Sequence, residues 1–175
     1  KDILETEMNL IYVNLPSIEY KDNRSNATNH NFYDGTSKEG KSIIPTIFIS
    51  SKAYGDKKIR YGFSITVPGG LTRRWDTAYQ KAYAQEFALK IIEFNPTMAY
   101  KISNNLSVAI GLRTLYNLGV VKSDGTDAQK PAIRDIEGMV MKYGYNVALA
   151  YKPTKKLNLS LTYRSNIDLE LEGNA

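Results

Sequence analysis

The sequence predicts an all-β fold, an antiparallel up-and-down sheet of about seven strands. Two observations carry this prediction. Apolar and polar side chains alternate along seven segments, and one Ala-Tyr phrase closes three of them before a short polar turn. The phrase occurs as Ala53-Tyr54, Ala99-Tyr100 and Ala150-Tyr151, before turns at residues 55–58, 101–105 and 152–156. Alternation with period two is typical of a strand with two unlike faces, and the repeat predicts a row of neighbouring hairpins.

The alternating segments give the strands in order. We expect them at residues 8–20, 43–53, 59–68, 87–100, 106–117, 139–151 and 157–171. Several exceed the five or six residues usual in soluble proteins and reach the ~9 to 11 residues that cross a bilayer at a tilt. The three short turns lie on one side, and long polar stretches near residues 21–42, 69–86 and 118–138 lie on the other. Outer-membrane barrels have this asymmetry of short periplasmic turns and long extracellular loops.

The two faces of the strands differ in a way that favours a membrane wall. Side chains two apart share a face. We place these residues on the outer face: Leu106, Val108, Ile110, Leu112, Leu157, Leu159, Leu161 and Tyr163. Their neighbours predict a small, polar inner face: Ser107, Ala109, Gly111, Arg113, Asn158, Ser160, Thr162 and Arg164. A packed soluble core would hold large apolar groups inside, so the pattern favours a transmembrane β-barrel with lipid outside and a lumen within.

Composition narrows the functional classes. The 175 residues, 42% of them hydrophobic, suffice for one domain over residues 1–175, here a partial transmembrane β-barrel domain. Thirteen tyrosines against five phenylalanines suit the aromatic girdles of membrane interfaces. The absence of cysteine excludes disulfides. The net charge of +5 is dispersed apart from short clusters at Lys57-Lys58, Arg73-Arg74 and Lys155-Lys156, which we interpret as solvated turns and not as a nucleic-acid partner's binding site. With His30 as the single histidine and no glycine-rich phosphate motif, we expect neither an enzyme nor a cofactor or metal site.

The long loops differ from one another. Residues 21–41 are rich in Asn, Ser, Asp and Gly, which predicts an exposed, mobile loop. In the second loop Trp75, Tyr79, Tyr83 and Phe87 recur every four residues, which would place them on one side of a short amphipathic helix. Such an aromatic face either packs against the barrel rim or captures an apolar ligand. Residues 122–137 indicate an ordinary surface loop.

Two arginines are candidates for binding an anionic head group. Arg113 and Arg164 each stand seven residues beyond the first leucine of their strand, so they should share a depth and a face. The planar guanidinium suits a carboxylate. The alternative is that they pair with inward acidic residues such as Glu93 or Asp168 and only support the interior.

The third strand carries a candidate break. Proline cannot donate to the ladder and glycine relaxes the backbone, so pairing should stop at Pro68, Gly69 and Gly70. In a barrel wall such a break is a candidate side opening, and the ordinary interpretation is a strand that ends in a turn. Pro96 is a second interruption in the neighbouring strand.

Three segments together resemble the FadL-type outer-membrane transporters of long-chain fatty acids and other hydrophobic compounds. They are residues 63–71 (FSITVPGGL), residues 94–101 (FNPTMAYK), and residues 161–165 (LTYRS) with Gly173-Asn174. The likeness covers nearly the whole chain. It implies a 14-stranded barrel in the outer membrane of Gram-negative bacteria, with an amino-terminal hatch. It also implies diffusion of the ligand to a lumenal site and its sideways release into outer-membrane lipid at a kink of the third strand, where Pro68, Gly69 and Gly70 lie.

The chain departs from this family pattern in two places. It shows no hatch segment before the first strand and stops after seven, so we expect about the first half of a barrel, with two strand edges that lipid would not tolerate unpaired. It also lacks the basic residue that relatives carry just beyond the tyrosine of the fifth strand, where Asn117 and Leu118 stand. Binding of a head group by Arg113 is therefore our own hypothesis.

Three functions stay open from the sequence. The first is passive uptake of long-chain fatty acids or other hydrophobic small molecules. The second is a structural or adhesive outer-membrane barrel whose loops bind a partner. The third is a soluble β-sandwich binding module, which would require the apolar faces to be buried against a second layer.

Overall fold

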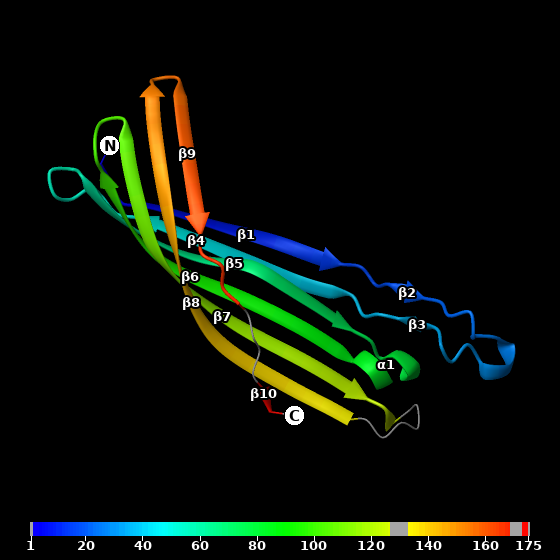
Figure 1. Ribbon diagram of the computed structural model, residues 1–175. Coiled ribbons are helices and arrows are strands. Elements are labelled where there is room, and N and C mark those ends of the chain that lie inside the picture. Colours follow the sequence, from blue (N-terminus) through cyan, green and yellow to red (C-terminus); the bar gives the residue numbers. More distant parts are fainter. Residues whose placement is uncertain (1, 127–132, 169–172, 175) are drawn as a thin grey trace.

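The computed structural model describes residues 2–126, 133–168 and 173–174. Its strands are β1 (Glu5–Leu15), β2 (Glu19–Tyr20), β3 (Gly35–Thr36), β4 (Gly40–Ser50), β5 (Ile59–Arg74), β6 (Glu86–Lys101), β7 (Leu106–Asp124), β8 (Ile133–Thr154), β9 (Leu157–Arg164) and β10 (Gly173–Asn174). The helical elements are η1 (Ala27–Asn29) and α1 (Ala78–Ala84). The antiparallel main sheet has the order β1-β4-β5-β6-β7-β8-β10, with β9 also paired to β8. It curls like half of a barrel wall, which confirms the predicted up-and-down fold (Figure 1).

The two ends of the sheet are unlike, as predicted. The tight turns lie at one end, and α1, η1 and the β2–β3 ribbon lie at the other (Figure 1). We call these the turn end and the loop end. The strands run further toward the loop end than expected, because β7 continues to Asp124 and β8 begins at Ile133. Lys122, which looks like a loop residue, stays in β7 because its Nζ lies 3.0 Å from carboxylate oxygens of Asp135 and Glu137 on β8.

The first long loop is more structured than predicted. The side chain of Asn26 caps η1 and accepts hydrogen bonds from the backbone N–H groups of Thr28 (2.9 Å) and Asn29 (3.1 Å). The Asp34 carboxylate accepts from the N–H of Asp22 at 2.9 Å. The polar side chains that predict a featureless loop therefore hold its backbone in a defined path.

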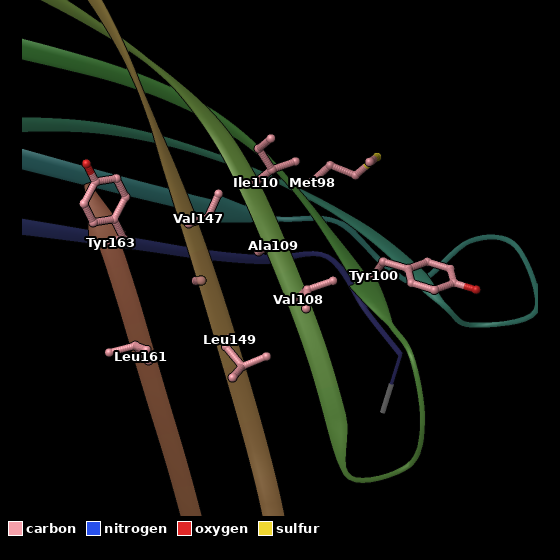
Figure 2. A pocket seen from close by; sticks show the side chains of 10 residues that line it. Met98, Tyr100, Val108, Ala109, Ile110, Val147, Leu149, Leu161 and Tyr163 are labelled. Carbon is pink, nitrogen blue, oxygen red and sulfur yellow. The ribbon is translucent and has the colours of Figure 1, made fainter. Parts of the chain in front are cut away.

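The outer face is open, as the membrane interpretation requires. Leu112, Tyr143 and Leu161 are 65%, 72% and 70% exposed, and no second layer of described residues covers them. The β-sandwich alternative is therefore wrong. On this face β6 to β9 enclose a shallow apolar hollow of about 410 Å³, in which Val108, Leu149 and Leu161 lie side by side (Figure 2).

The inner face is polar and tightly packed near the turn end. Asn95 Nδ2 donates to Asn146 Oδ1 at 3.0 Å, and Thr97 Oγ1 donates to Asn95 Oδ1 at 2.8 Å. Gly111 lies beneath this network, where a Cβ would approach both amide oxygens to 2.5 Å. Glycine is therefore required at position 111 for close approach, and the predicted small, polar interior is confirmed here.

The seventh strand is shorter than predicted. Pairing of β9 with β8 stops at Asn146↔Arg164, whereas we expected the strand to reach residue 171, of which residues 169–171 lie outside the described part. Ser165 ends the ladder, because its Oγ accepts from the N–H of Tyr145 at 2.9 Å. The chain then passes over the inner face, where a Cβ on Gly144 would lie 2.6 Å from Ile167. Pairing with β8 returns at Gly173↔Gly138.

Candidate functional site

The two predicted arginines meet on one buried carboxylate. Glu93 is 2% exposed and lies on the inner face of β6. Arg113 donates to Glu93 Oε2 from Nη2 at 2.8 Å and from Nε at 3.1 Å. Arg164 Nη2 donates to both carboxylate oxygens, at 2.6 Å to Oε2. The predicted common depth and face are confirmed. The partner is Glu93 and not Asp168, whose carboxylate accepts from Asn166.

The two guanidinium groups have different freedom within this cluster. Arg113 is buried and uses its remaining Nη1 to donate to the carbonyl oxygen of Ser165 at 2.9 Å. The Arg164 side chain is 50% exposed and contacts Glu93 through Nη2 alone. Two positive groups share one negative group, so the cluster keeps an excess positive charge. That charge is accessible at Arg164, whereas Arg113 holds Glu93 and the chain after β9 in place.

Toward the loop end the inner face becomes apolar. Phe87, Leu89 and Ile91 share a face with Glu93 by their alternation along β6. They pair with Val121, Gly119 and Asn117 of β7. We did not predict this surface from the sequence. Near the turn end the inner residues of the strands are small or polar, and we assumed the same for the whole length of each strand. The signal was present in residues 118–121, Leu-Gly-Val-Val, where apolar residues occupy both faces.

Asn117 interrupts this apolar surface. Its side chain is 0% exposed, and neither Oδ1 nor Nδ2 has a hydrogen-bond partner in the described part of the chain. Its cross-strand neighbours are Ile91 and Val140. An unpaired buried amide costs about 1 to 3 kcal/mol. Asn117 is thus an energetic weak point in the wall, at the position where the resemblance led us to look for a basic residue.

Aromatic residues gather around α1, although not as one helical face. α1 carries Tyr79 and Tyr83, whose ring centroids are 5.1 Å apart. Trp75 precedes the helix in a bridge with Ser37, and Phe87 lies in β6. The expected four-residue series is therefore wrong for these two outer members. The reason is tertiary, because Gln85 N–H donates to Lys122 O at 2.8 Å and ends the helix against β7.

An open groove of about 250 Å³ lies beside α1. It is lined by Tyr20, Arg24, Trp75, Tyr79, Gln80, Tyr83 and Ala84. The structure thus brings Trp75, Tyr79 and Tyr83 together and leaves Phe87 on the inner face of the sheet. Sequence reasoning missed Tyr20 and Arg24, because they approach α1 from a loop distant in the chain.

Arg24 organises the wall of this groove. Its guanidinium lies 4.5 Å from the ring centroid of Tyr33 and 5.3 Å from that of Tyr79. The same group forms a salt bridge with Asp22 at 2.7 Å. Hydrogen bonds from Arg24 hold the pKa of the Asp22 carboxyl well below its usual range, and Asp22 raises the pKa of Arg24 in return. The groove therefore combines aromatic rings with a fixed ion pair.

The third strand does not end at Pro68 but bulges there. Thr66 pairs with Glu93 and Gly69 pairs with Ile91, so two residues of β5, Val67 and Pro68, stand opposite one of β6. A bulge of this kind bends its strand and disrupts the ladder. Pro96 disturbs the strand pairing less than Pro68 does, because β6 and β7 keep one register on both sides of Pro96.

On its other edge β5 separates from β4. The two strands pair only from Ile47↔Ile65 to Ser50↔Gly62. Beyond this point residues 40–46 pair with β1 alone and residues 69–74 pair with β6 alone. We call the unpaired seam between residues 40–46 and 66–73 the window. Pro68, Gly69 and Gly70 lie along its edge.

The window is closed again at the loop end. Lys38 N–H donates to Arg74 O at 2.8 Å, next to the Ser37–Trp75 bridge. Arg73 Nη1 donates to Pro16 O at 2.9 Å and to Ser37 Oγ at 3.1 Å. The window is therefore a bounded interruption within a continuous wall.

The described residues offer little else that is chemically reactive. They contain no group of side chains suited to hold a metal ion, and no helix with the length and apolar run that crosses a bilayer. The inner face, the groove beside α1 and the window are therefore the candidate functional features.

Comparison with known proteins agrees with this geometry. The family described as "Outer membrane protein transport protein (OMPP1/FadL/TodX)" matches residues 2–175. A long-chain fatty acid transport protein of Escherichia coli O6:H1 is 24% identical over 88% of this chain and 41% of its own length. Its counterpart in Salmonella typhi is 21% identical over 78% and 37%. This chain therefore spans about two fifths of these relatives.

A solved structure supports the fold. The crystal structure of a Pseudomonas aeruginosa FadL homologue superposes with a TM-score of 0.61 at 16% identity, over 96% of this chain and 43% of that one. The comparison shows a shared β-barrel architecture. With a family match over nearly every residue, the chain belongs to the OMPP1/FadL/TodX family of outer membrane transport proteins.

Proposed function

We propose that this chain forms the capture, binding and release portion of a passive outer-membrane route for long-chain fatty acids or other hydrophobic small molecules. The window between β4 and β5, beside an apolar inner face, is the observation that carries the proposal. A barrel that serves only as a scaffold has no need of an unpaired seam, since the unpaired backbone groups are costly in lipid.

Capture takes place at the groove beside α1. Trp75, Tyr79 and Tyr83 offer apolar ring faces at the loop end, and the groove is open to solvent. Aromatic side chains provide large contact areas at low conformational cost. The groove holds part of an acyl chain and releases it inward, toward Phe87 on the inner face.

The inner face binds the ligand more completely. On β6 it extends six residues from Glu93 to Phe87, or about 20 Å at ~3.3 Å per residue. Each methylene buried there contributes about 0.8 kcal/mol, so even an eight-carbon tail supplies roughly 6 kcal/mol. Arg164, with Arg113 behind it, holds an anionic head group at the polar end. The driving force is hydrophobic throughout, and no covalent step is involved.

Release is sideways through the window. The bulge at Pro68 leads β5 away from β4, and Gly69 and Gly70 leave the edge without side chains. The ligand leaves from the surface around Ile91, which pairs with Gly69, and enters the lipid beside β4. A passive exit of this kind delivers an apolar tail to lipid without crossing water.

Deletion of Pro68 tests the route. It removes the extra residue of the bulge, which should let β5 follow a regular register and pair further along β4. In the full-length protein expressed from its natural coding sequence, we expect oleate uptake by cells to fall at least tenfold. Equilibrium binding of oleate to the purified protein should change less than twofold. Pro68→Ala keeps the bulge and is the matched control, with uptake near that of the wild type.

The outcomes separate the hypotheses. Unchanged uptake after the deletion would exclude the window as the exit. A wild-type protein that neither binds nor takes up oleate or other apolar probes would instead favour the structural or adhesive barrel.

The head-group role is tested separately. Arg164→Gln should weaken binding of oleate at least fivefold more than binding of oleyl alcohol, which has the same tail without the charge. Arg60→Gln removes a positive charge that pairs with Asp2 at 3.0 Å and serves as the control. Equal loss for both ligands would contradict a head-group role for Arg164. The double change Arg113→Ala with Arg164→Ala should show the same preference more strongly.

A further inference from the structure

Positive charge collects at the turn end of the sheet. Residues 51–58, 101–105 and 152–156 contain one acidic residue, Asp56, and seven lysines: Lys52, Lys57, Lys58, Lys101, Lys152, Lys155 and Lys156. Their net charge of +6 compares with +5 for the whole chain, so all other residues together carry −1. The basic character of this protein is thus a property of three short turns.

These lysines are not neutralised within the described chain. No described carboxylate forms an ion pair with Lys152, Lys155 or Lys156. At the loop end, in contrast, Lys38 pairs with Asp76 at 3.2 Å and Lys122 pairs with carboxylates of β8 at 3.0 Å. Part of the positive charge at the loop end is thus paired within the fold, whereas the turn lysines are left for an outside partner.

The unpaired lysines border the tyrosines of the repeated Ala-Tyr phrase. Tyr54, Tyr100 and Tyr151 are all exposed, and the latter two lie on the outer face with Met98 and Leu149. Lys52 Nζ lies 5.7 Å from the ring centroid of Tyr54. Tyrosine is enriched where the hydrocarbon meets the head groups. Lysines one to five residues beyond the tyrosines therefore lie at the level of lipid phosphates.

A polar hollow of about 450 Å³ opens between two of the turns. Asn104, Asn105, Lys152, Lys155, Lys156 and Asn158 contribute to its lining. The N–H of Lys152 donates to Asn105 O at 2.7 Å and fixes the two turns against each other. The lining residues thus include three lysines and three asparagines, whose ammonium and amide groups are the donors that a phosphate with a polar substituent requires.

We propose that the turn end binds the head groups of anionic phospholipids in the leaflet that it adjoins. A lipid fits better than an acidic protein, because the charge is spread along the rim of the wall, directly beside lipid-facing tyrosines. Each lysine near an anionic lipid surface contributes about 1 kcal/mol, and its flexible point charge suits phosphates whose positions vary. This site is distinct from the transport route and does not depend on it.

Lipid retention measured by native mass spectrometry tests the proposal. The full-length protein, expressed from its natural coding sequence, is equilibrated with equal amounts of dioleoylphosphatidylglycerol and dioleoylphosphatidylcholine. We expect at least a fivefold preference for the phosphatidylglycerol. The variant Lys152→Gln, Lys155→Gln, Lys156→Gln should reduce this preference below twofold. The control Lys21→Gln, Lys38→Gln, Lys41→Gln removes the same charge at the loop end and should keep it.

Measurements on the unaltered protein keep the test independent of folding of the variants. Raising sodium chloride to 0.5 M should reduce the wild-type preference at least twofold, because a salt concentration of this order screens exposed charges. Equal retention of the two lipids, or an equal loss in the loop-end control, would overturn the proposal. Tighter binding of soluble glycerophosphoglycerol, or of polyglutamate, than of the phosphatidylglycerol would also overturn it, in favour of a free phosphate or an acidic protein respectively.

Discussion

Two seams of this wall differ in continuity. Between β7 and β8 the register runs without interruption from Leu106↔Tyr151 to Asp124↔Ile133. Between β4 and β5 it covers only Ile47↔Ile65 to Ser50↔Gly62 before the window opens. The strands differ in local sequence, since β5 carries Pro68-Gly69-Gly70 at the window, whereas the paired parts of β7 and β8 contain no proline. The difference follows from β5, which bends at the bulge at Pro68 in its pairing with β6, whereas the β7–β8 ladder has no register shift.

The contrast shows how a barrel can open without losing its architecture. In a lipid wall each backbone group needs a partner, so an interruption is stable only when it is short and closed at both ends. Here the β4–β5 ladder closes it at the turn end, and Arg73, Ser37 and Trp75 close it at the loop end. In the function proposed above, the interrupted seam is the one that serves passage.

The largest expected effect concerns the continuous part of the wall. Glu93→Leu leaves Arg113 and Arg164 without their shared carboxylate, and removal of one partner from a buried charge cluster costs about 3 to 5 kcal/mol. Urea unfolding of the purified protein in detergent should show this loss. Glu7→Gln, at an exposed position of β1, is the control and should change stability by less than about 0.5 kcal/mol. A small effect of Glu93→Leu would mean that the continuous seams do not depend on this cluster.

The next substitution should stabilise the protein instead of destabilising it. Asn117→Leu replaces a fully buried amide that has no partner among the described residues. Removal of that penalty should stabilise the same wall by about 1 to 3 kcal/mol, again by urea unfolding. Asn95→Leu is the comparison, because Asn95 is hydrogen-bonded to Asn146 and Thr97 and its loss should destabilise. Destabilisation by Asn117→Leu would show that Asn117 has a partner in the folded protein.

The contacts that close the window at the loop end should contribute less to stability than the strand pairing in either seam. Arg73→Gln removes the hydrogen bonds to Pro16 and Ser37. Amide hydrogen exchange at Ile18 and Ser37, which bond to each other, should accelerate at least threefold. Amides along β7 and β8 should keep their rates. Equal acceleration in both seams would show that the window is not a local feature.

The smallest effect concerns pH at the groove. The folded pKa of Asp22 is lowered by Arg24, so this pair stabilises the loop above the unfolded value of about 3.9. The contribution is lost only as pH falls through the depressed folded pKa. Exchange protection around Tyr33 and Tyr79 should therefore persist from pH 7 to pH 4 and decline below that range. Asp22→Asn should remove this acid dependence, and its persistence in the variant would assign it to another group.

Much of the fold could be predicted from the alternation of apolar and polar side chains, because this alternation has a direct physical cause. Leu112, Leu161 and Tyr143 lie outward as expected, since apolar and polar side chains on opposite faces satisfy lipid and lumen together. The turns after Tyr100 and Tyr151 lie close to where the repeat placed them, although β8 continues to Thr154. The prediction that Ala53-Tyr54 closes a strand is wrong, because β4 ends at Ser50. Strand ends were less predictable, because Lys122 belongs to β7 through its pairing with Glu86 of β6 and Asp135 of β8, which are distant in the sequence.

The candidate site was less accessible to sequence reasoning. Arg113 and Arg164 were placed on one face, but the sharing of Glu93 between them depends on the register of three strands. The four-residue aromatic spacing predicted a helix for Tyr79 and Tyr83, whereas Phe87 was assigned to β6 by pairing with Val121. Arg24 also lines the groove, but it belongs to a separate loop, so its place there could not be predicted from the sequence.

By itself the sequence determined the strands, their two faces, the positions of the turns and the concentration of lysine at one end. These are local properties, set by side-chain period and turn chemistry within a few residues. Only the tertiary structure decided that the bulge at Pro68 opens a bounded window, that one carboxylate holds two arginines, and that the inner face turns apolar beside α1. These depend on register between strands, where a shift of one residue moves every side chain to the opposite face.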